Sequence, residues 1–304
     1  MKNKLLTLII SVVTLIPSLK AQTDIDALFM PKNNLCGGVI AGQSTWNHYW
    51  EGTLYRENLN IGSVNSQFAM AMANYGLTDK LNVIAMAPYV SNTATAGTLH
   101  AQSGIQDLTL MLKKELMLKT MMGIEFSAVG ILGGSSPLTH YVADYLPLSI
   151  GLGSKTGMGR LIVDGQKGHW YGTLSGTYTV RNQVKIDRTA YYTDQLIYSN
   201  MVAMPSVFGY NVRLGWRDHA EKIFELYLDV MNTLGGFDIR RNDMPFLSNN
   251  MDATRVGVNI KYPINLLNGL SVMANANKTI AGRNVGQTHT VQLGLVYQAD
   301  FSKK

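Results

Sequence analysis

The feature that most constrains this chain is a period-two alternation of apolar and polar residues that runs for about a dozen residues at a time. One face of the last such segment carries large apolar side chains: Val291, Leu293, Leu295 and Tyr297. The opposite face is small or polar except for Val296. Because successive side chains of a strand point to opposite faces, the pattern predicts a long strand with one apolar face. Soluble sheets favour strands of about five or six residues, whereas a tilted membrane-spanning strand needs about 9 to 11.

The same test predicts about twelve strands along the chain. They cover residues 45–56, 63–75, 81–91, 106–116, 121–133, 156–164, 169–181, 206–217, 223–233, 253–262, 269–280 and 289–301. Short turns mostly alternate with longer links, and an even strand number with short periplasmic turns is typical of bacterial barrels. The sequence therefore predicts an all-β fold, an antiparallel transmembrane β-barrel of about 12 strands of the bacterial outer-membrane type.

The low charge of the chain favours a membrane barrel over a soluble one. Only 15% of the residues are charged and 46% are hydrophobic, against about 25% charged in ordinary soluble domains. A soluble sandwich or lipocalin-like barrel, the alternative, would place charge on its exterior. In a membrane barrel lipid covers the outer wall, so charge is needed only inside and at the ends.

The N-terminus has the features of a secretory signal. Lys2 and Lys4 precede an apolar run that ends at Pro17, and Ala21 offers a cleavage point. The run is too short to span a bilayer as a helix, although an uncleaved anchor remains the alternative. We therefore expect a signal peptide at 1–21, a periplasmic lead-in or lumenal plug at 22–44, and a β-barrel at 45–301. The expected location is the bacterial outer membrane.

Charge and cysteine content exclude several kinds of partner. Lys2, Lys4 and Lys20 are three of the 26 basic residues, which leaves 23 against 20 acidic residues and no basic stripe. We therefore expect no nucleic-acid partner. The single Cys36 excludes an intramolecular disulfide or a cysteine-based metal cage.

Nothing in the sequence points to catalysis or to a cofactor. The glycine-rich stretch 151–157 resembles a phosphate loop only superficially, because no glycine precedes Lys155 and no helical pattern follows. The six histidines lack the spacing of metal ligands. We expect no enzyme, no catalytic residue, no metal and no cofactor. A hydrolase whose triad is assembled in space is the remaining alternative.

Charged residues on the polar strand faces are the candidates for a solute pathway through the lumen. These residues are Arg213, Arg217, Glu225, Asp229, Arg255, Lys261, Asp107 and Glu125. A tight turn at 218–222 would put Gly215 opposite Glu225, and Arg213 within diagonal reach of two acids. Two interpretations stay open: a polar constriction that selects solutes, and a salt-bridge network that fills the barrel.

Three short segments resemble a known family. Residues 49–52 (YWEG), 75–83 (YGLTDKLNV) and 104–110 (GIQDLTL) are similar to the outer-membrane transporter family named after the meta-pathway of phenol degradation. Gln106 stands where that family usually has a second glycine. The resemblance implies a barrel related in style to long-chain fatty-acid channels, which passes small hydrophobic or aromatic compounds.

We therefore expect an outer-membrane channel for passive uptake of small, hydrophobic or aromatic solutes. Its partners would be outer-membrane lipid and the small-molecule solute. The alternative is a non-transporting structural or secretion-associated barrel that anchors partner proteins. A packed lumen without a continuous path would favour that alternative.

Overall fold

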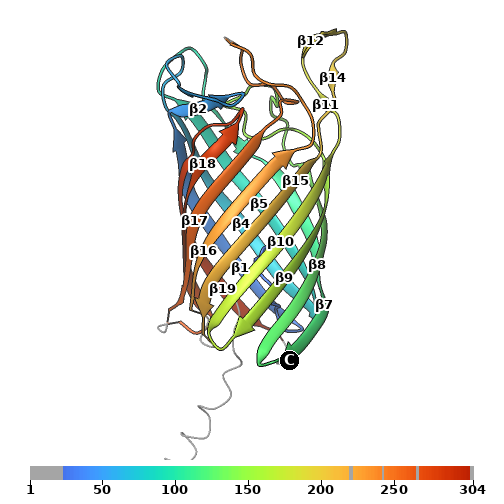
Figure 1. Ribbon diagram of the computed structural model, residues 1–304, viewed down its shortest axis with the longest axis vertical. Coiled ribbons are helices and arrows are strands. Elements are labelled where there is room, and N and C mark those ends of the chain that lie inside the picture. Colours follow the sequence, from blue (N-terminus) through green and yellow to red (C-terminus); the bar gives the residue numbers. More distant parts are fainter. Residues whose placement is uncertain (1–22, 219–221, 242, 265–266, 302–304) are drawn as a thin grey trace, which may run out of the picture.

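The computed structural model describes residues 23–218, 222–241, 243–264 and 267–301. These residues form a cylinder of tilted strands (Figure 1). Neighbouring strands are antiparallel, and β4 pairs with both β1 and β5, which closes the sheet. The short β6 continues the line of β7 beside β5, so the described wall has twelve strands. The predicted closed barrel is confirmed.

The wall strands follow one another in chain order. They are β1 (Asn34–Trp46), β4 (Val64–Thr78), β5 (Leu81–Ala94), β6 with β7 (Gln102–Ile105 and Asp107–Met121), β8 (Ile124–Pro137), β9 (Thr156–Lys167), β10 (Trp170–Arg181), β15 (Val207–Arg217), β16 (Ile223–Thr233), β17 (Asp252–Pro263), β18 (Leu270–Arg283) and β19 (His289–Asp300). The links contain β2 (His48–Glu51), β3 (Leu54–Glu57), β11 (Val184–Lys185), β12 (Tyr191–Tyr192), β13 (Leu196–Ile197) and β14 (Met201–Val202).

The first wall strand differs from the prediction. A strand at 45–56 is wrong, because residues 48–57 form the β2–β3 hairpin at the end of the barrel that carries the long links (Figure 1). The hairpin turns at Gly52, whose φ of 56° lies in the left-handed region that glycine tolerates. The first wall strand is β1, which pairs with β4 and β19. The barrel therefore begins at Asn34 rather than at residue 45.

The alternation of β1 is hidden in the sequence because its inward face is apolar. Cys36 and Ile40 point inward and are buried in one cluster with Met30 and Met72. The outward face carries Leu35, Gly37, Val39 and Ala41, and becomes polar only at Gln43 and Thr45. With apolar or small side chains on both faces, the period-two signal of a half-polar strand disappears.

The outer wall is apolar, as lipid requires. Leu293 is 61% exposed on β19, and the other large exposed residues of the wall include Leu132, Leu174, Leu214 and Leu226. Aromatic residues lie near the strand ends beside the short turns: Trp170, Trp216, Phe224, Tyr262 and Tyr297. This is the interfacial girdle of a membrane barrel. The described residues contain no helix that is long and apolar enough to cross a bilayer.

The two ends of the barrel differ. Short turns join β4 to β5, β7 to β8 and β9 to β10 at the end of the barrel where β19 ends (Figure 1). The longest links, including the one with β11 to β14, project from the other end. Short turns mark the periplasmic side of outer-membrane barrels. The expected signal peptide lies outside the described residues.

Candidate functional site in the barrel lumen

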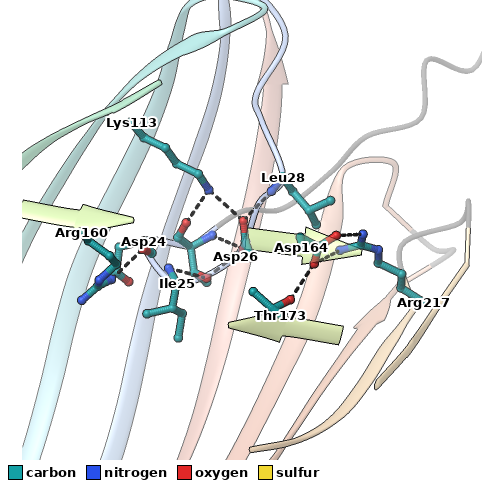
Figure 2. Close-up of polar contacts among 10 residues, drawn as sticks. Asp24, Ile25, Asp26, Leu28, Lys113, Arg160, Asp164, Thr173 and Arg217 are labelled. Carbon is teal, nitrogen blue, oxygen red and sulfur yellow. Dashed lines mark hydrogen bonds and ion pairs between the residues drawn. The ribbon is translucent and has the colours of Figure 1, made fainter. Parts of the chain in front are cut away.

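Residues 23–33, called the plug below, fold back into the lumen before β1 begins. Two carboxylates fix the plug to the inner wall (Figure 2). Asp26 lies 2.8 Å from Nζ of Lys113 on β7, and Asp24 lies 2.8 Å from Nη1 of Arg160 on β9. Lys113 also donates to the carbonyl of Thr23 at 2.9 Å. Of the two alternatives for the segment before the barrel, lead-in or plug, these contacts favour a plug.

The other side of the plug is apolar and meets an apolar patch of the inner wall. Ala27 and Phe29 pack on a buried cluster from β5, β7, β8 and β9: Ile84, Met111, Val129, Ile131 and Ile162. Lys113 lies over the ring of Phe29, 5.3 Å from its centroid. Met30 is fully buried with Cys36 and Val296. This contact explains why Val296 breaks the polar face of β19.

Asp26 is charged in its lumenal position. Burial disfavours its charged form, but the Lys113 ammonium and the hydrogen bonds from Lys113 and Thr23 outweigh burial and hold the pKa of Asp26 below its ordinary value. The backbone N–H of Leu28 also donates to the carboxylate. An ionised Asp26 therefore compensates the charge of Lys113, whose side chain is fully buried.

Below the middle of the barrel, β9, β10 and β15 share an ionic cluster. Arg217 donates to Asp164 at 2.6 Å, and its Nε donates to Gln166 at 2.6 Å. Thr173 donates to the same Asp164 carboxylate (Figure 2). The guanidinium of Arg217 also lies 4.3 Å from the ring centroid of Tyr171. The buried carboxylate of Asp164 and the buried guanidinium of Arg217 therefore compensate each other's charge.

A second cluster lies on β15, β16 and β17. Arg213 forms an ion pair with Glu225, which also accepts from Tyr171 and Asn259. The strand register is the expected one, with Gly215 opposite Glu225. Arg213 and Glu225 are both almost completely buried.

Asp229 belongs to the more open part of this cluster. It pairs with Arg255 at 3.1 Å and accepts from Asn211 at 3.3 Å. About a third of each side chain of the Asp229–Arg255 pair is exposed to the lumen. Arg213, Arg217, Glu225, Asp229 and Arg255, the candidates on β15, β16 and β17 described so far, are called the charge ladder below, and the Asp229–Arg255 pair is its most accessible part.

Of the three other candidates, Lys261 lines a small lumenal cavity together with Arg213, Arg217 and Glu225, whereas Asp107 and Glu125 lie elsewhere. Lys261 is 2% exposed near the periplasmic end of β17. Asp107 begins β7 at the opposite end of the barrel and accepts from the Tyr141 hydroxyl at 2.6 Å. Glu125 lies one residue from the β7–β8 turn and is exposed. The structure therefore does not bring Asp107 and Glu125 into one site with the ladder.

Between the plug and the long links lies a cavity of about 540 Å³. One wall, from β1, β4, β5 and β18, is apolar: Ile40, Met70, Met72, Met86 and Met273. The facing wall presents amides and charges: Asn211, Arg213, Asp229, Arg255, Asn259, Asn275 and Asn277. Ile25 of the plug lines it as well. Met side chains are flexible and polarizable, which suits an apolar surface that adapts to different ligands.

The described residues contain no group of three histidine, cysteine or acidic side chains arranged to hold a metal ion. Arg213, Asp229 and Arg255 line the cavity together with amide side chains, and the cavity has the size of a small-molecule site.

No family model and no curated protein matches this chain. Among solved structures, the COG4313 outer membrane channel from Pseudomonas putida F1 is similar, with a TM-score of 0.73, 16% identity, and 92% of this chain and 99% of that chain covered. The NanC porin (TM-score 0.45, 7% identity, 85% and 98% covered) and the translocator domain of the autotransporter NalP from Neisseria meningitidis (0.44, 12%, 90% and 90%) are less similar. The first likeness shows that this chain has the fold of an outer-membrane β-barrel. The resemblance to the phenol meta-pathway family rests on its three short segments and remains a prediction.

Proposed function

We propose that this protein is an outer-membrane channel for passive uptake of small, hydrophobic or aromatic solutes, with the plug as its periplasmic gate. The cavity carries the proposal, because an apolar wall of methionines faces a wall of amides and charges across about 540 Å³. That volume lies within the range of small-molecule sites, about 300 to 1,000 Å³. The fold it shares with a bacterial outer-membrane channel supports the same role.

The contacts of the plug support a gate rather than a permanent part of the wall. The plug is held by side-chain ion pairs and by packing of Phe29 and Met30, whereas each wall strand is held by continuous ladders of backbone bonds. Local opening takes the least stable elements first. The plug can therefore leave the lumen while the barrel stays folded, and its departure opens a path from the cavity toward the periplasm.

The alternative, a non-transporting barrel that anchors partner proteins, is favoured by two observations. The plug and the ionic clusters fill much of the lower lumen. The β7–β8 hairpin reaches lower than the other turns in Figure 1 and exposes Met121 and Met122, the latter at 90%. A permanently closed lumen with a protruding apolar hairpin would suit a docking role.

Uptake of a hydrophobic probe separates the two functions. Cells that express the chain are compared with cells that lack it, using the fluorescence of 1-N-phenylnaphthylamine as it enters across the outer membrane. We expect faster uptake with the wild type, and still faster uptake with the full-length Asp24→Asn/Asp26→Asn variant, whose plug is released. The matched control is Asp187→Asn, the same change on an exposed link. Equal uptake in all cells, with the barrels folded, would exclude the channel and leave the anchor.

A further inference from the structure

Three links at the extracellular end meet at one asparagine. Asn284 follows β18, is 3% exposed and has a left-handed φ of 53°. Its Oδ1 accepts from the backbone N–H groups of Gly52 at 2.8 Å and Ile239 at 3.0 Å. Its Nδ2 donates to Asp238 at 2.7 Å and to the carbonyl of Asn250 at 2.6 Å. An amide side chain has two donor hydrogens and one acceptor oxygen with two lone pairs, so Asn284 uses its full capacity.

These bonds join the β2–β3 hairpin, the described residues 234–241 and 243–251 of the link 234–251, and the link 284–288, which together are called the cap below. Arg283 strengthens the junction through two bonds of 2.7 Å to Asp238. Hydrogen bonding by Arg283 holds the pKa of Asp238 below its ordinary value, so this acceptor stays charged at neutral pH. The cap is thus tied together by side chains at one buried point.

The β2–β3 hairpin also lies flat on the link 284–288. The N–H of Trp50 donates to the carbonyl of Val285 at 2.9 Å. The Trp46 ring covers Gly286 so closely that a Cβ at Gly286 would lie 2.5 Å from it. Trp46 ends β1, and the hairpin itself pairs with Gly286 through Tyr49 and accepts at the His48 carbonyl from the N–H of Gln287 at 2.8 Å. The link 234–251 reaches the hairpin through Asn284.

The link 284–288 brings the cap to the outer end of the cavity. Thr288, four residues after Asn284, lines the cavity together with Thr290 and Ser44. The Thr288 hydroxyl lies 2.7 Å from that of Thr279 on β18. The plug lines the same cavity from the opposite side through Thr23 and Ile25. The cavity thus lies between two segments that are not part of the barrel wall.

We propose that the cap is an outer gate of the cavity and that Asn284 is the residue that latches it. The inference rests on the proposed channel function and adds a second point of control to it. Asn284 acts as a positioning residue: it holds three links in the closed arrangement without contacting the solute. The barrel ladders do not depend on its side chain, so the cap can open while the wall stays intact.

The test removes the latch and keeps the backbone. Asn284→Gly deletes the four side-chain bonds, and glycine accepts the left-handed φ without strain. Asn200→Gly is the matched control, since Asn200 is exposed on another extracellular link. A docked plug would hide a change at the cap, so both changes are made in the Asp24→Asn/Asp26→Asn background. We expect Asn284→Gly to raise KCl conductance in planar bilayers and arabinose-driven liposome swelling several-fold, and Asn200→Gly to leave both unchanged.

A reversible lock tests the opposite direction. A Cβ built at Gly52 lies 3.9 Å from Cβ of Asp238, within the range of about 3.5 to 4.5 Å for a disulfide. Cysteine at position 52 must take the left-handed φ of 56°, so the oxidised chain is compared with the reduced form of the same chain, which carries the same strain. In the same background, Gly52→Cys/Asp238→Cys should lose most of its conductance when oxidised and regain it on reduction. Release of the plug uncovers the native Cys36, so it is replaced by serine in this variant and in its background, which leaves the two introduced thiols as the reacting pair. Heat-modifiable gel mobility confirms that each variant has a folded barrel.

The outcomes separate this proposal from the channel function itself. If the released-plug background conducts, and neither Asn284→Gly nor the oxidised lock changes its conductance, the cap is not a gate and the channel function stands. If no variant conducts although all are folded, the channel function fails and the cap proposal fails with it. Conductance that rises with Asn284→Gly and falls with the oxidised lock supports the outer gate.

Discussion

Replacement of Asp26 by asparagine tests how the plug is held. Lys113 is fully buried, and its Nζ lies 2.8 Å from the Asp26 carboxylate. Loss of one partner of a buried ion pair costs about 3–5 kcal/mol, because the other charge stays buried without its counter-ion. Asparagine keeps an oxygen for the N–H of Leu28, so we expect the lower end, about 3 kcal/mol. That corresponds to a roughly hundredfold larger population of the undocked plug.

Cys36 provides the assay for this population. Its thiol is fully buried next to Met30 of the plug, on the inward face of β1. A water-soluble thiol reagent therefore reaches it only after the plug has moved. When redocking is faster than labelling, the labelling rate follows the undocked population. We expect Cys36 in Asp26→Asn to be labelled roughly a hundred times faster than in the wild type.

Two controls decide whether the ion pair is responsible. Asp26→Asn/Lys113→Met removes both charges and leaves no buried charge unpaired, so the labelling rate should return toward the wild-type value. Asp187→Asn makes the same substitution on an exposed link and should change nothing. An unchanged labelling rate in Asp26→Asn would refute the view that this pair holds the plug in the lumen.

Three further predictions follow from the wall, the plug and the lumenal clusters. Leu293→Arg should weaken folding into lipid vesicles by about 2–4 kcal/mol, because Leu293 faces lipid, whereas Gln292→Arg points into the cavity and should cost much less; equal effects in urea titrations would contradict the assigned faces. The pKa of Asp26 is lowered, so its contribution to docking is complete above the ordinary carboxyl pKa and is lost as the pH falls through the depressed value. The rate of Cys36 labelling, corrected for the thiolate fraction, should therefore be constant down to about pH 4 and rise only below that pH. Arg213→Ala leaves the buried Glu225 without its ion-pair partner and should lower the free energy of unfolding by about 3–5 kcal/mol. The loss of stability should be smaller in Arg213→Ala/Glu225→Gln. An equal loss in the double variant would show that packing, rather than the unpaired charge, causes the destabilisation.

The strand faces and most of the register can be predicted from the sequence alone. In β15, β16, β17 and most of β19, apolar side chains on one face alternate with polar, charged or small ones on the other, and the observed pairing of Gly215 with Glu225 follows from a tight turn. The alternation is informative there because water-filled lumen and lipid make opposite demands on the two faces. Val296, the one exception on β19, points to a contact inside the barrel and proves to touch the plug cluster.

The same alternation fails where the inner wall is covered by protein. Cys36 and Ile40 of β1 face inward but pack on Met30, so they need not be polar. The first strand is therefore missed, and the hairpin at 48–57 is taken for it. Only the pairing with β4 and β19 reveals the true first strand.

The partners of the lumenal cations are also beyond the reach of sequence patterns. Lys113 is recognisable as inward-facing, yet its carboxylate partner lies 87 residues away in the plug. The neighbouring strand offers Ile131 opposite Lys113 and Arg160, which leaves both cations without an acid beside them. Two inward-facing cations without a neighbouring acid indicate that their partners come from elsewhere in the chain. Asp24 and Asp26, which follow the expected signal peptide, are such acids, so together these features would have indicated a docked segment.

The most direct test of the account is the current through single molecules of the purified chain in planar lipid bilayers. A gated channel predicts rare, brief openings for the wild type. The full-length Asp24→Asn/Asp26→Asn variant should give long openings, and Asp187→Asn should match the wild type. A bilayer that stays silent with folded wild type and folded Asp24→Asn/Asp26→Asn alike would contradict it.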